Sequence, residues 1–238
     1  SRFEVVRMPD VVTKDLMKVY RAGKSEVIAL RGLEMKMADK ELVAVQGPSG
    51  CGKTTLLNLV GGIDRPTAGR VEIDGANIVD YSEGELVRYR RDQVGFVFQF
   101  FNLVPTLTAG ENIELPMRLA NKPASHRKTR TKQLLQLVDL ENRAVHRPDE
   151  LSGGEQQRIA IAVALSNDPS LILADEPTGE LDTENGQRVL DLFEVLNKDM
   201  GKTVLIVTHD QRVSEITRRI LQIEDGKIIG EVVPPSTS

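Results

Sequence analysis

A glycine-rich stretch that matches the pattern G-x-x-x-x-G-K-[ST] carries the strongest chemical signal in this sequence. It contains Gly47, Pro48, Ser49, Gly50, Cys51, Gly52, Lys53 and Thr54. Glycines in such a loop let successive backbone N–H groups point inward at phosphate oxygens, and the following helix adds its partial positive charge. The lysine can reach the β- and γ-phosphates, and the threonine hydroxyl can ligate Mg²⁺. Because the stretch follows an apolar run and opens a helical pattern, it predicts a nucleoside triphosphate site.

Two neighbouring carboxylates supply the other half of that chemistry. Asp175 and Glu176 follow the apolar run Leu171-Ile-Leu-Ala174, at the end of a strand where open α/β sheets bind their ligands. Asp175 is suited to hold Mg²⁺ through water, and Glu176 is suited to polarise an attacking water. Two acids alone could simply cap the next helix. Together with the phosphate loop they indicate hydrolysis of the triphosphate.

Hydrophobic periodicity predicts the elements that hold these residues. Apolar and polar residues alternate before residue 46, including 3–6, which predicts short antiparallel strands. Apolar strands are expected at 42–45, 94–98, 171–174, 203–208 and 220–223, with helices at 54–61 and about 184–199. Fully apolar strands that alternate with helices predict a parallel sheet covered on both faces. Helical spacing dominates from 108 to 167, so a helical lobe inserted into this α/β fold is expected.

Composition and charge exclude several classes of protein. The chain has 238 residues, of which 40% are hydrophobic and 28% charged, as in ordinary globular proteins. The net charge of −4 argues against nucleic-acid binding through a broad basic face, so the basic clusters at 88–91 and 127–132 are interpreted as solvated helix faces. One cysteine excludes an intramolecular disulfide. No apolar run approaches the roughly 18 residues of a membrane span, so another chain is expected to supply any span.

Beyond these features, the segment Leu151-Ser-Gly-Gly-Glu155 resembles the signature motif of the ABC ATPases, and the other motifs of that family occur in the same order. Tyr20 resembles the aromatic residue that stacks on adenine. Gln99 resembles the glutamine that links Mg²⁺ and the attacking water to the helical lobe. The segment Gly179-Glu-Leu-Asp182 resembles the D-loop, and His209 resembles the switch histidine. The resemblance covers about residues 3 to 231.

The resemblance implies a P-loop NTPase with a RecA-like core over 1–98 and 168–231 and a helical signature lobe over 99–167. The composition of the end of the chain, 232–238, predicts a disordered tail or the stub of a linker. It implies Mg²⁺-dependent ATP hydrolysis by a head-to-tail homodimer in which each signature motif closes on the nucleotide of the partner. Glu176, His209 and Gln99 are the catalytic residues that it implies. Nucleotide contacts are implied for Tyr20, the loop Gly47 to Thr54, Thr55, Ser152, Gly153, Gly154 and Asp182, and metal contacts for Thr54, Gln99 and Asp175.

Segments 95–99, 101–103, 111–116 and 175–179 narrow the resemblance to the branch with lipoprotein-releasing, macrolide-exporter and cell-division ATPases. This branch implies an integral membrane permease as partner and a peripheral location on the cytoplasmic face of the cell membrane. It implies export or release of a lipophilic or peptide-like substrate. The apolar residues after Gln99, at 100–104, are expected to line a groove that receives a short helix of the permease; the alternative is that they pack the junction between the two lobes.

Three positions depart from the commonest pattern of the family. Glu155 replaces the usual glutamine of the signature motif, and Val163 stands where arginine is common. Glu180 occupies a D-loop position usually filled by a small or amide residue. An unpaired carboxylate beside a triphosphate at an interface is unfavourable, so Glu180 is expected to weaken the dimer.

Two other functions stay open from the sequence. DNA-maintenance ATPases share this ATPase head but carry a long coiled coil or zinc-binding cysteines between the phosphate loop and the signature. Residues 55–150 contain no sustained heptads and no cysteine, which disfavours that class. A regulatory ATPase that signals through a membrane protein without transport has the same sequence features as a transporter subunit.

Overall fold

The computed structural model describes residues 10–23 and 25–234. Its helices are α1 (Lys53–Val60), α2 (Glu83–Asp92), α3 (Ala109–Leu119), α4 (Ala124–Leu137), α5 (Gly153–Ala164) and α6 (Thr183–Lys198). The larger sheet contains β3 (Leu42–Gln46), β6 (Val94–Val97), β7 (Leu171–Asp175), β8 (Thr203–Thr208), β9 (Arg219–Glu224) and β10 (Lys227–Val232). The smaller sheet contains β1 (Val11–Ala22), β2 (Ser25–Met37), β4 (Ala68–Ile73) and β5 (Ala76–Asn77).

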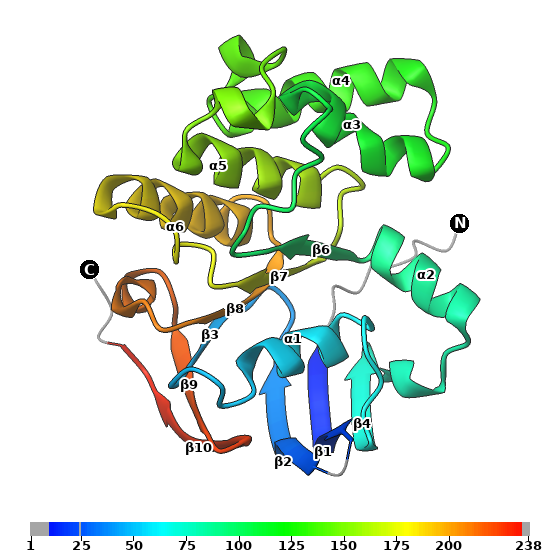
Figure 1. The fold of residues 1–238 in the computed structure, drawn as a ribbon, viewed down its shortest axis with the longest axis vertical. Coiled ribbons are helices and arrows are strands. Elements are labelled where there is room, and N and C mark those ends of the chain that lie inside the picture. The colour runs from blue at the N-terminus through cyan, green and yellow to red at the C-terminus, as the bar shows by residue number, and fades with distance from the viewer. Residues whose placement is uncertain (1–9, 24, 235–238) are drawn as a thin grey trace, which may run out of the picture.

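The two sheets have different topologies and enclose α1 between them (Figure 1). The larger sheet has the order β10-β9-β3-β8-β7-β6, and all its neighbours are parallel except β9 and β10. The smaller sheet has the order β2-β1-β4-β5 and is antiparallel. This confirms the predicted α/β P-loop fold with its antiparallel region.

The central strand β3 shows why the parallel strands read as continuous apolar runs. Its side chains point alternately to opposite faces of the sheet. Val43 and Val45 pack into the core formed with α1 and the antiparallel sheet, whereas Leu42 and Ala44 pack into the core formed with α5 and α6. Because helices or a second sheet cover both faces, every position of the strand except its last is buried.

Helices α3, α4 and α5 all occur between β6 and β7 and gather at the top of Figure 1. The helix α3 begins with a capping box in which Thr108 and Glu111 satisfy each other's backbone N–H groups. The same arrangement of Ser152 and Glu155 begins α5. Ile159 and Ile161 of α5 then join the core on the α6 side of the larger sheet. The helical insertion is therefore packed directly against the sheet that carries the carboxylates.

Several elements differ from the sequence-based expectations. The strands β1 and β2 have 12 and 13 residues and are not short. The helix α2 was not expected, because only Leu86 and Tyr89 of this polar segment are buried. Val232 belongs to β10 and not to the expected disordered tail. The expected strand at 3–6 and the tail residues 235–238 lie outside the described residues.

Three arginines of the basic clusters make hydrogen bonds or ion pairs with other parts of the fold. For these three, the interpretation as solvated helix faces was wrong. Arg90 donates to the carbonyl of Gly62 just after α1 (2.5 Å), and Arg130 donates to the carbonyl of Leu165 at the end of α5 (2.9 Å). Arg127 pairs with Glu114 (2.6 Å). Carbonyls at helix ends lack intrahelical partners, and guanidinium groups satisfy them here.

Candidate active site

The phosphate loop joins β3 to α1 and depends on glycine at Gly52. The φ angle of Gly52 is +106°, and a Cβ atom there would lie 2.5 Å from the carbonyl oxygen of Ala29. No other residue type fits that position without displacing β2. Inside the loop, Lys53 is buried and donates to the carbonyl oxygens of Gly47 (2.8 Å) and Pro48 (3.0 Å). The ammonium group of Lys53 therefore lies inside the loop, where the sequence predicts the phosphates.

A cavity of about 310 Å³ opens beside this loop. The predicted residues that line it are Ser49, Gly50, Gly52, Lys53, Thr54, Thr55, Gln99, Asp175 and Glu176. Val27, Ile28 and Ala29 of β2 also line it and were missed, although Tyr20 pairs directly with Val27 in the sheet. In the sequence these three residues are only an apolar run within an alternating strand. Their position beside the cavity depends on the pairing of β1 with β2, which the sequence does not show.

Asp175 and Thr54 form a set of oxygen donors that fits a hard cation such as Mg²⁺. The hydroxyl of Thr54 hydrogen-bonds to Asp175. Burial and the negative charge of Glu176 raise the pKa of Asp175, and these two effects outweigh the hydrogen bond from Thr54 and the charge of Lys53. The Oδ1 atom of Asp175 is buried without a hydrogen-bond partner among the described residues. A bound cation would supply the partner that this oxygen lacks.

Glu176 is held firmly in an unusual conformation at the end of β7. Its φ angle of +45° lies in the left-handed region, which costs free energy for a residue other than glycine. Its Oε2 atom accepts hydrogen bonds from the Thr208 hydroxyl (2.9 Å) and the His209 backbone N–H (3.1 Å). The His209 Nδ1 atom lies 2.9 Å from the same oxygen. Glu176 and His209, predicted from separate segments, are therefore in direct contact.

Gln99 follows β6 and reaches toward the D-loop of its own chain. Its Nε2 atom donates to the Oε1 atom of Glu180 (2.8 Å). A Cβ atom at Gly179 would lie 3.3 Å from the same Nε2 atom, so the amide lies against this loop. Glu180 is thus paired within its own subunit, which removes the premise that an unpaired carboxylate would weaken the dimer.

Tyr20 lies near the end of β1, beyond the residues that pair with β4, and 39% of its surface is exposed, so it is not a packed core tyrosine. Its hydroxyl donates to Asp64 (3.1 Å), and the Nζ atom of Lys18 lies 4.9 Å from its ring centroid. Burial raises the pKa of Asp64, but hydrogen bonds from Lys18, the Arg65 backbone and Tyr20 outweigh it and lower the pKa. Neither contact was predicted: Lys18 lies two residues before Tyr20 on β1, whereas Asp64 follows α1 and reaches Tyr20 only through the tertiary fold.

The signature motif forms the beginning of α5, as its Ser-x-x-Glu pattern allows. The Ser152 hydroxyl accepts from the Glu155 backbone N–H (3.2 Å), and Glu155 pairs with Arg143 (2.9 Å), which explains a glutamate at this position. Gly154 is buried against α6, where a Cβ atom would lie 2.4 Å from Asn185 Oδ1. Among the described residues, those lining the cavity beside the phosphate loop include none of Ser152, Gly153 and Gly154.

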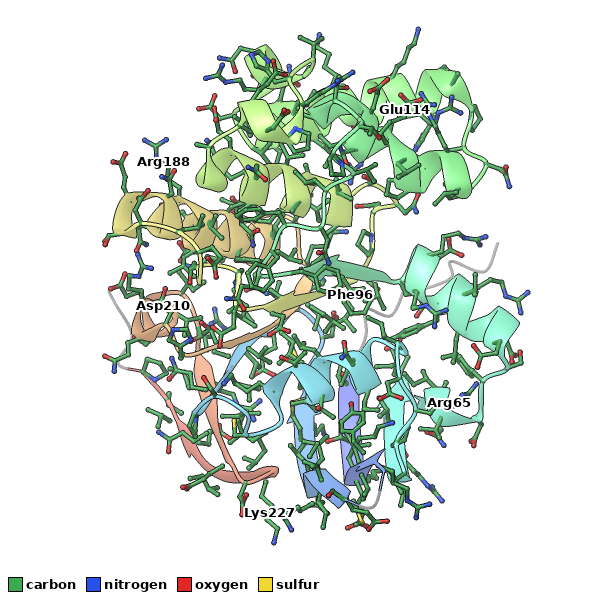
Figure 2. The ribbon with its side chains drawn as sticks, viewed as in Figure 1. Arg65, Phe96, Glu114, Arg188, Asp210 and Lys227 are labelled. Atoms are coloured by element: carbon green, nitrogen blue, oxygen red, sulfur yellow. The ribbon has the colours of Figure 1, made fainter. Side chains whose placement is uncertain are left out.

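Asp182 caps α6 of its own chain. Its carboxylate accepts from the backbone N–H of Asn185 (2.9 Å) and from the side chain of Asn185 (2.6 Å). These hydrogen bonds lower the pKa of Asp182. Nearby, Asp210 accepts from the Thr178 hydroxyl (2.7 Å) and pairs with Arg212 (2.7 Å), below α6 in Figure 2. This second network, which was not predicted, ties the residue after His209 to the D-loop segment.

The comparison with known families agrees with this arrangement. The family model described as ABC transporter matches residues 30–179. The chain belongs to the ABC transporter ATPase family. This ABC ATPase therefore binds ATP and is an ATP-hydrolysing enzyme, as the phosphate loop and carboxylates predicted.

Its relatives include transporter ATPases from bacteria and archaea. It is 50% identical to an ABC transporter ATP-binding protein of Thermotoga maritima over 216 residues, which cover 91% of this chain and 92% of that protein. It is 43% identical to the macrolide export ATP-binding/permease protein MacB of Hyphomonas neptunium over 94% of this chain, but only 34% of that protein.

A solved structure of the cassette MJ0796 from Methanocaldococcus jannaschii has the same fold. It superposes with a TM-score of 0.88 and 42% identity, and covers 95% of this chain and 99% of that chain. That structure is a dimer in a post-hydrolysis state bound to ADP and Pi. The dimer and the nucleotide belong to the relative.

Cys51 offers a chemical test of the loop, because it is the one cysteine of the chain. Its side chain is 6% exposed, and its Sγ atom lies 4.0 Å from Lys53 Nζ. We expect N-ethylmaleimide to label Cys51 slowly, because the side chain is almost fully buried, and we expect ATP to slow the reaction further. Fully labelled protein is expected to lose ATP binding, measured by isothermal titration calorimetry.

The matched control is Cys51→Ser, which keeps the volume of the side chain and removes the reactive thiol. This variant is expected to bind ATP and to resist labelling. Full ATP affinity in quantitatively labelled protein would show that the Cys51 side chain does not lie close to the bound phosphates.

Proposed function

We propose that this ABC ATPase works as a head-to-tail homodimer that uses Mg²⁺-ATP to power a membrane permease. The observation that supports the dimer is that the phosphate loop and the N-terminus of α5, both suited to bind anions, are separate within one chain. The cavity beside Lys53 has the phosphate loop and the carboxylates, whereas the signature helix begins outside it. A second copy would bring the exposed N-terminus of its α5 to the γ-phosphate, where glycine amides and the helix dipole favour an anion.

In the proposed reaction Glu176 polarises the attacking water, and His209 orients Glu176 through their direct contact. Lys53 and the partner subunit's Ser152 and Gly154 stabilise the charge on the γ-phosphate. Thr54, Asp175 and Gln99 would hold Mg²⁺, which neutralises charge on the β- and γ-phosphate oxygens when bound. Tyr20 and the β2 residues at 27–29 provide the surface on which the adenine stacks.

The permease is proposed on two grounds. First, this chain matches 34% of MacB, and the name of MacB describes an ATP-binding protein and a permease in one chain. In addition, an apolar groove of about 450 Å³ lies where α2, β6 and the ends of α3 and α5 meet. Its lining includes Val87, Phe96, Pro116, Leu119, Val163 and Ala164. We name it the α2–α3 groove; its lining residue Phe96 is labelled in Figure 2.

The α2–α3 groove differs from the one expected at 100–104. Among the described residues, none of that segment lines it. Phe101 instead lies close to Gly153, whose Cβ atom would be 3.8 Å from the Phe101 ring. Leu103 packs against the core shared with α5. Val163, where arginine is common in the family, completes the apolar lining of the groove.

A short apolar or amphipathic helix of the permease fits a groove of this chemistry, because it would cover Leu119 and Val87, which are 72% and 51% exposed. The described residues include no helix with the length and apolar composition needed to cross a bilayer. We place this ATPase at the cytoplasmic face of the cell membrane through that contact. The proposed cargo is a lipophilic or peptide-like molecule that is exported or released.

Co-purification from detergent-solubilised native membranes tests the proposal. The tagged ATPase is expected to retain one integral membrane protein in stoichiometric amount, and reconstitution of the pair in liposomes is expected to show ATP-driven movement of a substrate. Recovery of the ATPase without a membrane protein would contradict the proposed partner. A stable complex that hydrolyses ATP and moves no substrate would instead favour the regulatory function.

A further inference from the structure

The pairing of Gln99 with Glu180 has a chemical consequence for the orientation of the amide. A carboxylate can only accept hydrogen bonds, so the atom of Gln99 that faces Glu180 must be the amide nitrogen. The amide oxygen is bonded to the same carbon and is therefore turned away from Glu180. A small residue at position 180 would leave the Gln99 amide free to rotate. An asparagine or glutamine at position 180 could hydrogen-bond to either the nitrogen or the oxygen of the Gln99 amide.

Hydrogen bonds hold the loop segment that precedes Glu180. The Gly179 N–H donates to the carbonyl of Glu176 (3.0 Å), and the Thr178 hydroxyl donates to Asp210 (2.7 Å). The Gln99 amide packs against Gly179: a Cβ atom added to this glycine would lie 3.5 Å from the Gln99 Cδ atom. Glu180 is exposed, but it follows this hydrogen-bonded turn and accepts from Gln99.

We propose that Glu180 is a positioning residue that holds the Gln99 amide with its oxygen available to the Mg²⁺ of the bound nucleotide. Gln99 lines the cavity together with Thr54 and Asp175, and amide oxygens are ligands that hard cations accept. The inference rests on the proposed Mg²⁺ site and deepens it. It assigns a function to the glutamate that sets this D-loop apart from the commonest family pattern.

The test measures how strongly Mg²⁺ enhances nucleotide binding. The dissociation constant of the non-hydrolysable analogue AMP-PNP is measured by calorimetry in EDTA and in saturating Mg²⁺, and the ratio of the two values reports the metal contacts. Glu180→Ala is expected to lower this ratio about fivefold, the equivalent of about 1 kcal/mol. Glu180→Gln, which keeps the size but not the acceptor-only chemistry, is expected to lower it less.

The EDTA value separates orientation from simple charge repulsion. Removing a negative charge near the phosphates would strengthen binding in EDTA as well, whereas loss of orientation changes only the ratio. In a double-mutant cycle, Glu180→Ala is expected to have no further effect on the ratio once Gln99→Ala is present.

Two results would overturn the proposal: an unchanged ratio in Glu180→Ala, or the same decrease in the Gln99→Ala background. If Mg²⁺ does not enhance binding to the wild-type protein, the proposed Mg²⁺ site itself is wrong. These outcomes therefore distinguish a failure of the positioning residue from a failure of the proposed site.

Discussion

Glu176→Gln is expected to lower ATP hydrolysis by about two to four orders of magnitude, the contribution of a positioned general base. Nucleotide binding should persist, because the glutamine oxygen can still accept from the Thr208 hydroxyl and the His209 N–H. Without hydrolysis, the ATP-bound state should accumulate as a stable dimer. Phosphate release measures the rate, and light scattering with ATP and Mg²⁺ measures the mass.

The matched control for this substitution is Glu184→Gln on α6. Glu184 is exposed and pairs with Arg188 one helical turn away, so its loss should leave hydrolysis and mass unchanged. Wild-type hydrolysis in Glu176→Gln would mean that another group activates the water. A monomer in ATP, with hydrolysis abolished, would contradict the proposed head-to-tail dimer and leave the base assignment intact.

Leu119→Asp is expected to weaken the complex with the permease about tenfold or more, because an interface anchor would be replaced by a charge. Leu119 is 72% exposed at the end of α3, so the isolated ATPase should fold and bind ATP normally. Co-purification from native membranes, followed by calorimetric ATP binding on the purified variant, measures both properties. Val145→Asp is the control, since Val145 is 77% exposed outside the α2–α3 groove.

Phe101→Asp distinguishes the two possible docking surfaces. If the permease binds the segment at 100–104, Phe101→Asp abolishes co-purification while Leu119→Asp does not, and the assignment of the α2–α3 groove is wrong. If it binds the α2–α3 groove, Leu119→Asp has the larger effect. Phe101 is half-buried beside Gly153, so thermal melting of Phe101→Asp must show that the protein still folds.

The motifs and the buried strands were predictable from the sequence because they depend on local rules. The phosphate loop is recognisable locally, because glycines at fixed spacing and the following Lys53 form one continuous pattern before a helix. Short, fully apolar runs such as Leu171-Ile-Leu-Ala174 are typical of strands that are covered on both faces. The order of the motifs then identified the ABC ATPases, and the family match confirmed it.

Contacts between segments far apart in the chain were decided by the tertiary structure alone. The sequence indicated an acid at Glu180 and an amide at Gln99, but only the packing of the D-loop beside β6 pairs them, 81 residues apart. Likewise, the α2–α3 groove needs four elements to meet, and no single element has its apolar pattern. Hydrogen bonds and grooves depend on the positions of atoms in space, whereas periodicity reports only which face of one element is buried.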